Sequence, residues 1–290
     1  MLQKDQVALA MRETVSRSQL DRKLPKDIAR PATHVELRQI YDANERALAG
    51  LYHFNALAVS RLVPQGGMVL DLGSGSAGFL SYLAKRRPDL QIIGVEADPN
   101  LLELGQTIIA EQGVSERVSL NEGLSTQFAE RIPTRIDMIT SVFSLNRLPS
   151  TNDLLTCLHE ALTVRIRCGC AIWFFDYARP NHPKTAEDYP ATLMPGAPVL
   201  FRWDVRNALM SAFSPAEVEE AFGKVSFGTV YHAVSNNLKV FQAHWIERED
   251  HAGGGSQELW HEGFLPTPAV AHFKSVCSMF PKVPLPPHLK

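Results

Sequence analysis

The sequence has few cysteines, no long apolar run and no excess of positive charge. Its four cysteines form neither a disulfide framework nor a zinc pattern. Cys168 and Cys170 are separated by a single residue, and no second pair of Cys or His residues lies nearby. We therefore interpret them, together with Cys157 and Cys277, as reduced thiols of a cytoplasmic protein that binds no metal.

No apolar run approaches the roughly 20 residues of a helix that crosses a bilayer, and the first residues contain no apolar signal core. We therefore expect neither secretion nor a contact with the membrane. The 29 Lys and Arg residues are balanced by 31 Asp and Glu residues, which gives a formal net charge of −2. Because general nucleic-acid binding usually requires a basic surface, this balance argues against a nucleic-acid partner.

The chain is long and apolar enough to bury a large core, with 290 residues of which 45% are hydrophobic. Residues 1–62 have helical spacing interrupted by prolines and are predicted to form a helical cap. Residues 63–246 are predicted to form the main domain, in which the proline-rich residues 176–212 form a long loop on the substrate side. Residues 247–290 are a proline-rich tail that begins near Gly253-Gly254-Gly255.

Short apolar runs alternate with amphipathic stretches through the main domain. Strands are predicted at residues 68–72, 91–96, 118–120, 136–142 and 170–175, followed by a hairpin of residues 226–233 and 239–246 joined at Ser235-Asn236-Asn237. Helices are predicted to begin near Gly78, after Pro99 and near Asn152. This alternation favours an α/β fold with a doubly wound, mostly parallel sheet, whose ligand lies at the carboxyl ends of the strands.

The most informative stretch follows the first predicted strand, where Gly73, Gly75 and Gly78 form the pattern G-x-G-x-x-G. The third glycine begins a predicted helix, so the backbone can pass close beneath a bound nucleotide. About 20 residues further on, the next strand ends at Glu96, whose carboxylate can accept hydrogen bonds from both ribose hydroxyls. We therefore predict a nucleoside-containing ligand, although Glu96 is also explained by a solvated charge at the end of a strand.

Asp71 distinguishes between the two ligands that fit such a loop, a dinucleotide such as NAD and S-adenosylmethionine. A dinucleotide would bring an anionic pyrophosphate near this carboxylate, and the two would repel each other. S-adenosylmethionine carries a sulfonium and an ammonium group, which a carboxylate attracts. Asp71 therefore favours S-adenosylmethionine, while a role in capping the loop amides is compatible with this interpretation.

At this point the residues resemble the class I S-adenosylmethionine-dependent methyltransferases. Residues 71–78 resemble the first motif of that family, and residues 94–99 resemble its second motif, whose acidic residue holds the adenosine ribose. Residues 135–145 are similar to the stretch beneath the methionine moiety. The resemblance extends from residue 68 to 245 and implies a seven-stranded sheet with an antiparallel last strand. It also implies that the cofactor-binding residues are Asp71, Gly73, Ser74, Gly75, Gly78, Glu96, Ala97, Gly123, Leu124 and Ser141.

The sequence departs from the family pattern at two places. Leu124 stands where many members have an acidic residue beside the adenine, so the adenine amino group would need a backbone carbonyl, Ser125 or Glu122 as its partner. Asn146 stands where many small-molecule members have a histidine, so catalysis by that histidine cannot be transferred. The Asn/Asp-Pro-Pro-aromatic motif of nucleic-acid amino methylases is absent, which weakens the hypothesis of a nucleic-acid base as acceptor.

Methyl transfer from a sulfonium requires alignment, exclusion of water and, for a hydroxyl or carbon acceptor, a base. The residues after the strand at 170–175 are the best candidates, and we predict that Asp176, Tyr177 and His182 are catalytic. Arg179 and Asn146 are predicted to bind the substrate. In a simpler interpretation, Asp176 and Arg179 pair with each other to brace the loop and His182 is a turn residue.

Tyr41 and Tyr52 in the N-terminal region are also predicted to bind the substrate. They lie about three helical turns apart, so a single helix would align them on one face. Packing in the core or in a lid is the simpler interpretation of both residues.

The leading hypothesis is therefore a small-molecule methyltransferase that uses S-adenosylmethionine. The alternatives are a protein or RNA methyltransferase, a non-catalytic protein that binds S-adenosylmethionine as a partner of another, and an NAD-dependent oxidoreductase, which shares the glycine spacing. The N-terminal helices and the C-terminal tail are candidate contact surfaces for a partner protein or for a second copy of the chain. The acceptor atom stays open between O, N, S and C.

Overall fold

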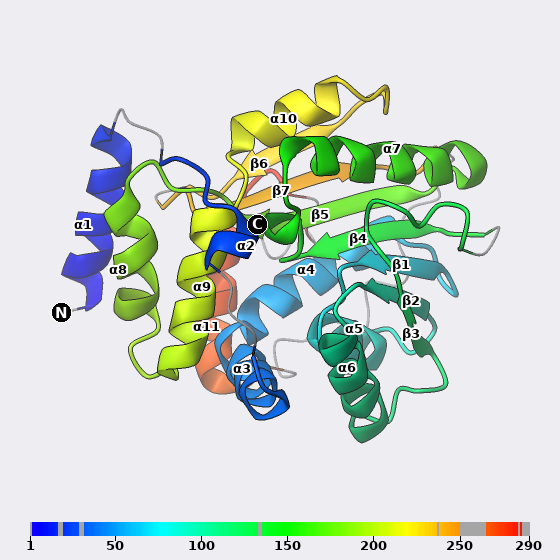
Figure 1. The fold of residues 1–290 in the computed structure, drawn as a ribbon, viewed down its shortest axis with the longest axis horizontal. Coiled ribbons are helices and arrows are strands. Elements are labelled where there is room, and N and C mark those ends of the chain that lie inside the picture. Colours follow the sequence, from blue (N-terminus) through cyan, green and yellow to red (C-terminus); the bar gives the residue numbers. More distant parts are fainter. Residues whose placement is uncertain are drawn as a thin grey trace.

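A seven-stranded sheet forms the centre of the computed structural model, which describes residues 2–16, 20–28, 32–132, 135–236, 238–249, 265–283 and 285 (Figure 1). The strands lie in the order β3-β2-β1-β4-β5-β7-β6. Their bounds are β1 Met68–Leu72, β2 Gln91–Glu96, β3 Val118–Glu122, β4 Met138–Val142, β5 Ala171–Tyr177, β6 Tyr231–Val234 and β7 Phe241–Ile246. β1 to β5 are parallel, whereas β7 is antiparallel to both β5 and β6, which confirms the predicted fold class.

The strand order reverses beside β1. The chain first proceeds from β1 through β2 to β3, and then returns to place β4 and β5 on the other side of β1. The register sets Asp71 opposite Gly94 on β2 and Thr140 on β4. In open α/β sheets, such a reversal leaves a crevice at the carboxyl ends of the strands, and ligands bind there. The topology therefore predicts a ligand site at the carboxyl ends of β1, β2 and β4.

Helices cover both faces of the sheet, with α4, α5 and α11 on one face and α7 and α10 on the other (Figure 1). Within the part of the chain that the structure describes, no helix combines the length and apolar character needed to cross a bilayer. The helical segments are α1 Leu2–Val15, α2 Pro25–Ile28, α3 His34–Ala47, α4 Ala49–Leu62, α5 Gly78–Arg86, α6 Pro99–Glu111, η1 Leu145–Arg147, α7 Thr151–Cys168, α8 Pro183–Leu193, α9 Val199–Ser211, α10 Pro215–Gly223 and α11 Thr267–Met279.

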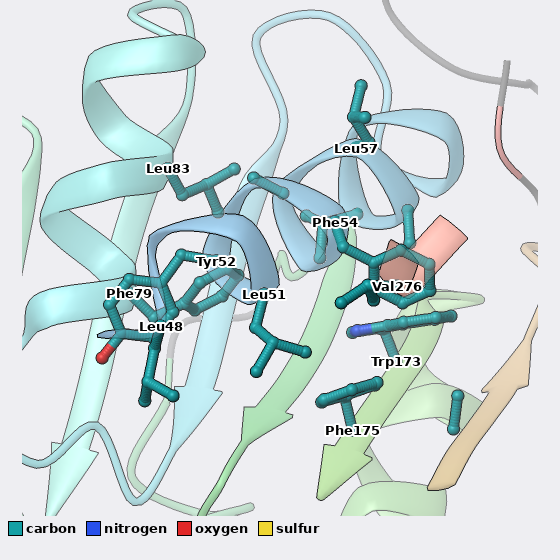
Figure 2. Packing of buried hydrophobic residues seen from close by; sticks show 14 of the residues in the cluster. Leu48, Leu51, Tyr52, Phe54, Leu57, Phe79, Leu83, Trp173, Phe175 and Val276 are labelled. Carbon is teal, nitrogen blue, oxygen red and sulfur yellow. The ribbon is translucent and has the colours of Figure 1, made fainter. Parts of the chain in front are cut away.

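α4 is almost completely buried and packs directly against the sheet (Figure 2). The ring centroid of Phe54 lies 5.7 Å from that of Phe175 and 5.3 Å from that of Phe280, which follows α11. The neighbouring Asn55 accepts a 2.8 Å hydrogen bond from the indole N–H of Trp173. The last helix of the predicted cap thus contributes to the core of the main sheet, and the predicted domain boundary at residue 62 stays a prediction.

The prediction of a loop at residues 176–212 is wrong, because most of this segment forms α8 and α9. Its prolines do not break these helices. Pro183 occupies the first turn of α8, where proline is tolerated because the missing N–H would have no partner, and Pro198 precedes α9. Phe201, Val205 and Ala208 are buried at helical spacing on α9. The number of prolines suggested a loop, although the spacing of the apolar residues is that of a helix.

Three smaller predictions are also corrected. Tyr41 and Tyr52 do not share a helix, because the chain breaks at Leu48 between α3 and α4. β6 begins at Tyr231, so the predicted first hairpin strand is shorter than expected, and Asn237 of the predicted hairpin turn lies outside the described residues. The glycines of the tail, residues 253–255, lie outside them as well.

We expect Thr33→Ala to lower the free energy of unfolding by about 1 kcal/mol. Thr33 caps α3 in a reciprocal capping box, in which the Glu36 N–H donates to Thr33 Oγ1 at 3.3 Å and the Thr33 N–H donates to Glu36 Oε2 at 2.9 Å. Chemical denaturation would measure the change. The matched control is Thr163→Ala within α7, which should be near neutral because alanine is the better helix former. Equal losses in both variants would contradict the capping argument.

Candidate active site

The glycine loop between β1 and α5 adopts conformations that favour glycine. Gly73 has φ +69° and Gly75 has φ +54°, both in the left-handed region. A Cβ at Gly73 would lie 2.6 Å from the Ser144 side chain, so any other residue would collide with the segment that follows β4. The Gly73 and Ser74 N–H groups both donate to the Val95 carbonyl, which ties the loop to β2. The loop is therefore held close to the ends of three strands.

Asp71 lies at the base of this loop, and the residue is 3% exposed. Thr140 Oγ1 donates a 2.6 Å hydrogen bond to Asp71 Oδ1. Burial is the main cause that raises the pKa of Asp71 to about 7; the Thr140 hydrogen bond opposes this shift and the charge of Glu96 adds to it. A positively charged ligand in the adjacent cavity would stabilise the ionised form of this carboxyl group.

Glu96 ends β2 and is held in place by three backbone N–H groups. Its Oε2 accepts from the Gly75 N–H at 2.7 Å, and its Oε1 accepts from the Ala97 and Asp98 N–H groups at 2.9 Å each. The residue is 8% exposed and lines the cavity. The carboxylate is thus fixed in orientation, and it retains lone pairs that hydroxyl groups of a ligand can use.

A cavity of about 830 Å³ lies at the ends of β1, β2 and β4, and α3 and α9 contribute to its walls. A larger cavity of about 1260 Å³ lies between α1, α8 and α11, but none of the glycine-loop residues lines it, so we assign the site to the smaller one. Of the predicted site residues, those that line the smaller cavity are Tyr52, Asp71, Gly73, Ser74, Gly75, Gly78, Glu96, Ala97, Leu124, Asn146 and Tyr177.

Two predicted cofactor-binding residues, Gly123 and Ser141, do not line this cavity. Ser141 is completely buried, and its hydroxyl lies 2.7 Å from that of Ser144, which does line the cavity and donates to the Leu72 carbonyl. Ser141 thus supports the loop from behind. Of the candidate adenine partners, Ser125 lines the cavity beside Leu124, whereas Glu122 does not.

Tyr41 and Tyr52 meet at Gly78 although they belong to different helices. A Cβ at Gly78 would lie 3.2 Å from the Tyr52 hydroxyl, 3.5 Å from the Tyr41 ring and 3.1 Å from Glu45 Oε1. Tyr41 does not line the cavity and instead packs against α6, where burial raises its pKa to about 12.

Glu45 was not identified from the sequence as a residue near the glycine loop. Burial raises its pKa to about 7, and its Oε1 is buried without a hydrogen-bond partner among the described residues.

Asp176 and Asn146 form a buried pair beneath the cavity. The Asn146 N–H donates to Asp176 Oδ2 at 2.9 Å, and the Asn146 amide group donates to Asp176 Oδ1 at 2.8 Å. The Tyr177 N–H also donates to Asp176 Oδ1 at 2.6 Å. Burial raises the pKa of Asp176 to about 6 despite these hydrogen bonds. Asp176 does not line the cavity, so its predicted catalytic role is corrected to one of positioning Asn146.

Arg179 and His182 do not face the cavity, contrary to their predicted roles. Arg179 neither binds there nor pairs with Asp176, because its guanidinium forms a 2.9 Å ion pair with Glu217 of α10. The His182 imidazole caps α8 by accepting from the Lys184 N–H at 3.1 Å. Tyr177 does line the cavity, but burial raises its pKa well above the usual value, which makes it a poor base.

The sequence matches the methyltransferase domain family over residues 70–165. That segment contains the glycine loop, Glu96 and the Asn146 turn described above. Solved structures of S-adenosylmethionine-dependent methyltransferases share this fold. The match over residues 70–165 agrees with the predicted resemblance, as do the sheet order and the antiparallel β7.

Curated relatives match this chain over short stretches. A demethylmenaquinone methyltransferase from Lactiplantibacillus plantarum is 28% identical over 116 residues, which cover 40% of this chain and 47% of the relative. A release factor glutamine methyltransferase from Geobacter sulfurreducens is 37% identical over 81 residues, which cover 28% of this chain and 27% of the relative. The chain therefore spans less than half of the length of these two relatives.

A solved structure resembles the fold over most of the chain. The plantazolicin methyltransferase BpumL, in complex with SAH, superimposes with a TM-score of 0.55 at 11% identity and covers 86% of this chain and 100% of that chain. An identity this low supports the fold alone. The two relatives and this structure differ in the acceptors that their names state, so an acceptor for this chain must be argued from its own cavity.

α9 forms one wall of the cavity, in the segment that was predicted to be a loop on the substrate side. Its members are Leu200, Trp203, Asp204, Val205, Asn207, Ala208 and Ser211. Asp204 forms a 2.8 Å ion pair with Arg147 next to Asn146. The spacing of Leu200, Asp204 and Ala208 at four-residue intervals was the available signal, because residues at that spacing share one face of a helix.

Proposed function

We propose that this methyltransferase transfers a methyl group from S-adenosylmethionine to a small-molecule acceptor. The observation that carries the proposal is the placement of the Asp71 and Glu96 carboxylates in one cavity beneath the glycine loop. Glu96 would accept hydrogen bonds from the ribose hydroxyls, and Asp71 would face the positive charge of the methionine part. When bound, S-adenosylmethionine supplies a methyl group that its sulfonium has already activated.

The size of the cavity supports a small acceptor. α3 contributes Leu37, Ile40 and Asn44 to its lining, and α9 contributes Trp203 and its neighbours. A volume of about 830 Å³ lies in the range of small-molecule sites. The predicted cytoplasmic location and the contact surfaces for a partner stay predictions.

Two measurements test the proposal. Calorimetry should detect binding of S-adenosylmethionine and of its demethylated product, and no binding of NADH. Labelled methyl groups should then appear in the fraction of a cell extract below about 1 kDa. Label in the protein or RNA fraction, removed by protease or nuclease, would contradict a small acceptor. Binding without any labelled product would favour the non-catalytic alternative.

The pKa of Asp71 predicts that S-adenosylmethionine binds more weakly in acid. With a pKa of about 7, the ionised fraction of Asp71 falls about tenfold between pH 8 and pH 6, and a cationic ligand binds the ionised form. We expect the Kd to rise about tenfold over this range and the Asp71→Asn variant to bind weakly with a flat profile. Glu45 has a similar pKa, so a profile that becomes flat in Glu45→Gln but not in Asp71→Asn would contradict the assignment.

The same pKa has a second consequence for the cofactor-free protein. The folded pKa of Asp71 is raised from 3.8 to about 7, so its contribution to stability is present below pH 3.8 and is lost as the pH rises toward 7. Asp71→Asn should therefore increase the free energy of unfolding at pH 8 while it weakens ligand binding. Denaturant titrations of both proteins at pH 5 and pH 8 would measure this difference.

A further inference from the structure

The side-chain oxygen of Asn146 is a buried acceptor without a partner among the described residues. Asn146 is 1% exposed and lines the cavity, and its Oδ1 atom makes no hydrogen bond within the described part of the chain. A buried carbonyl oxygen without a donor is unfavourable, and most such atoms in native proteins are satisfied by water or by a ligand. The position of Asn146 in the candidate site points to a ligand that donates a hydrogen bond.

The orientation of the Asn146 amide is fixed by its neighbours. Its NH₂ group donates to Asp176 Oδ1 at 2.8 Å and to the Phe143 carbonyl at 3.2 Å. The reversed amide would place its oxygen against both of these acceptors and would be strongly disfavoured. Both amide protons are thus in use, and the ligand meets an atom that can only accept. Asp176 is the positioning residue that maintains this arrangement.

This acceptor restricts the nucleophile of the methyl transfer. An amide oxygen cannot take a proton, so Asn146 cannot activate a hydroxyl group as a base. The lone pairs of Oδ1 would also repel a thiolate or a phenolate. Asp204 pairs with Arg147 and Asp153 accepts from the Ser150 hydroxyl, so protein partners hold both of these cavity-lining carboxylates in place. The neutral form of an amine avoids each difficulty, because its nitrogen lone pair can attack without the loss of a proton and its N–H is a donor.

We propose, on the basis of the methyltransferase function above, that the acceptor is the nitrogen of a small neutral amine and that Asn146 Oδ1 binds its N–H. The nitrogen lone pair forms the new N–C bond, the S–C bond breaks, and its electron pair stays on sulfur. The positive charge thereby passes from sulfur to nitrogen, and the product ammonium later loses a proton to water. The N–H bond to Asn146 strengthens as this charge develops, which is how an acceptor contributes to rate.

The aromatic lining fits the same product. Phe143 and Tyr177 both line the cavity, and their ring centroids are 4.9 Å apart. Aromatic rings attract a cation near their faces through the ring quadrupole, so they favour an ammonium group over a neutral ether or thioether product. Phe143 also accepts from Asn146 through its carbonyl, which places the rings and the amide in one local structure.

Matched acceptors that differ in one atom test the proposal. The purified chain would receive S-adenosylmethionine with a ¹³C-labelled methyl group and four triplets of amine, alcohol and thiol, with benzyl, 2-phenylethyl, hexyl and cyclohexylmethyl groups. The assay is run at about pH 9, because alkyl amines have pKa values of about 10 and part of each amine is then neutral. NMR of the products reports which element carries the methyl group. We expect N-methyl products. Asn146→Ala should lower kcat/KM for the amine by about 10- to 100-fold with an unchanged Kd for S-adenosylmethionine, and the surface control Asn152→Ala should change neither.

The remaining outcomes overturn the proposal in distinguishable ways. Three outcomes would reject the amine assignment alone. The first is preferred methylation of the alcohol or thiol, and the second is methylation of none of the triplets by a chain that binds S-adenosylmethionine. The third is an Asn146→Ala variant with full amine activity. Failure to bind S-adenosylmethionine would reject the proposed function itself. If Asn146→Ala does not fold, the preference of the wild-type chain among N, O and S still decides the question.

Discussion

Replacing Glu96 by Gln is expected to weaken the binding of S-adenosylmethionine by at least about 100-fold. The carboxylate would accept two ribose hydroxyls, and hydrogen bonds to a charged group contribute about 1.5–3 kcal/mol each. The amide also presents an NH₂ group to one of the N–H donors that surround this side chain, at Gly75 or at Ala97 and Asp98. The loss of a charged acceptor and the repulsion between N–H donors both weaken the binding of S-adenosylmethionine.

Calorimetry with S-adenosylmethionine and with its demethylated product measures this effect. Both ligands contain the same ribose, so both should lose the same affinity. The matched control is Glu122→Gln, because Glu122 lies opposite Glu96 on the neighbouring strand and is exposed. A loss below about fivefold for Glu96→Gln, or an equal loss for the control, would show that Glu96 does not hold the ribose.

Gly73→Ala is expected to abolish measurable binding of S-adenosylmethionine and to lower the free energy of unfolding by about 2–4 kcal/mol. A residue with a Cβ is strained at the φ of +69° found at Gly73. The Cβ would also lie 2.6 Å from the Ser144 side chain, which holds the end of β1 by donating to the Leu72 carbonyl. The collision cannot be relieved without moving the loop or the turn after β4.

The variant Gly66→Ala distinguishes backbone strain from the collision with a neighbouring side chain. Gly66 has a similar φ of +66°, but a Cβ there would meet nothing within 4 Å. That variant should lose only about 1–2 kcal/mol of stability from backbone strain and should bind S-adenosylmethionine normally. Denaturant titration and calorimetry on both variants supply the comparison. Equal losses of stability, or normal binding by Gly73→Ala, would contradict the proposed close approach of the loop to Ser144.

The parallel strands and the glycine loop could be predicted because they depend on local patterns. Each strand is a short apolar run, and Gly73, Gly75 and Gly78 follow the first of these runs at a spacing that few other structures require. The helices α8 and α9 were missed because proline was taken as a sign of a loop, whereas Pro183 and Pro198 stand at helix starts.

The roles of the polar residues near the substrate could not be predicted, because they depend on partners far away in the chain. Asp176 appeared free for catalysis, yet the pairing of β4 with β5 brings it to Asn146, 30 residues earlier. Arg179 appeared to face the substrate, yet it pairs with Glu217, 38 residues later. Sequence spacing indicates which face of its own element a residue occupies, but it does not indicate which residue of another element lies opposite.

The amino-acid sequence by itself determined the fold class and the position of the nucleotide loop, because hydrophobic periodicity and glycine spacing act over a few neighbouring residues. Only the tertiary structure decided which polar groups reach the cavity and which form hydrogen bonds or ion pairs with other protein groups instead. Burial raises the pKa of Asp71, and the Asn146 amide is oriented by Asp176 and Phe143. Desolvation and hydrogen-bond saturation are properties of packed surroundings, and a linear pattern does not contain them.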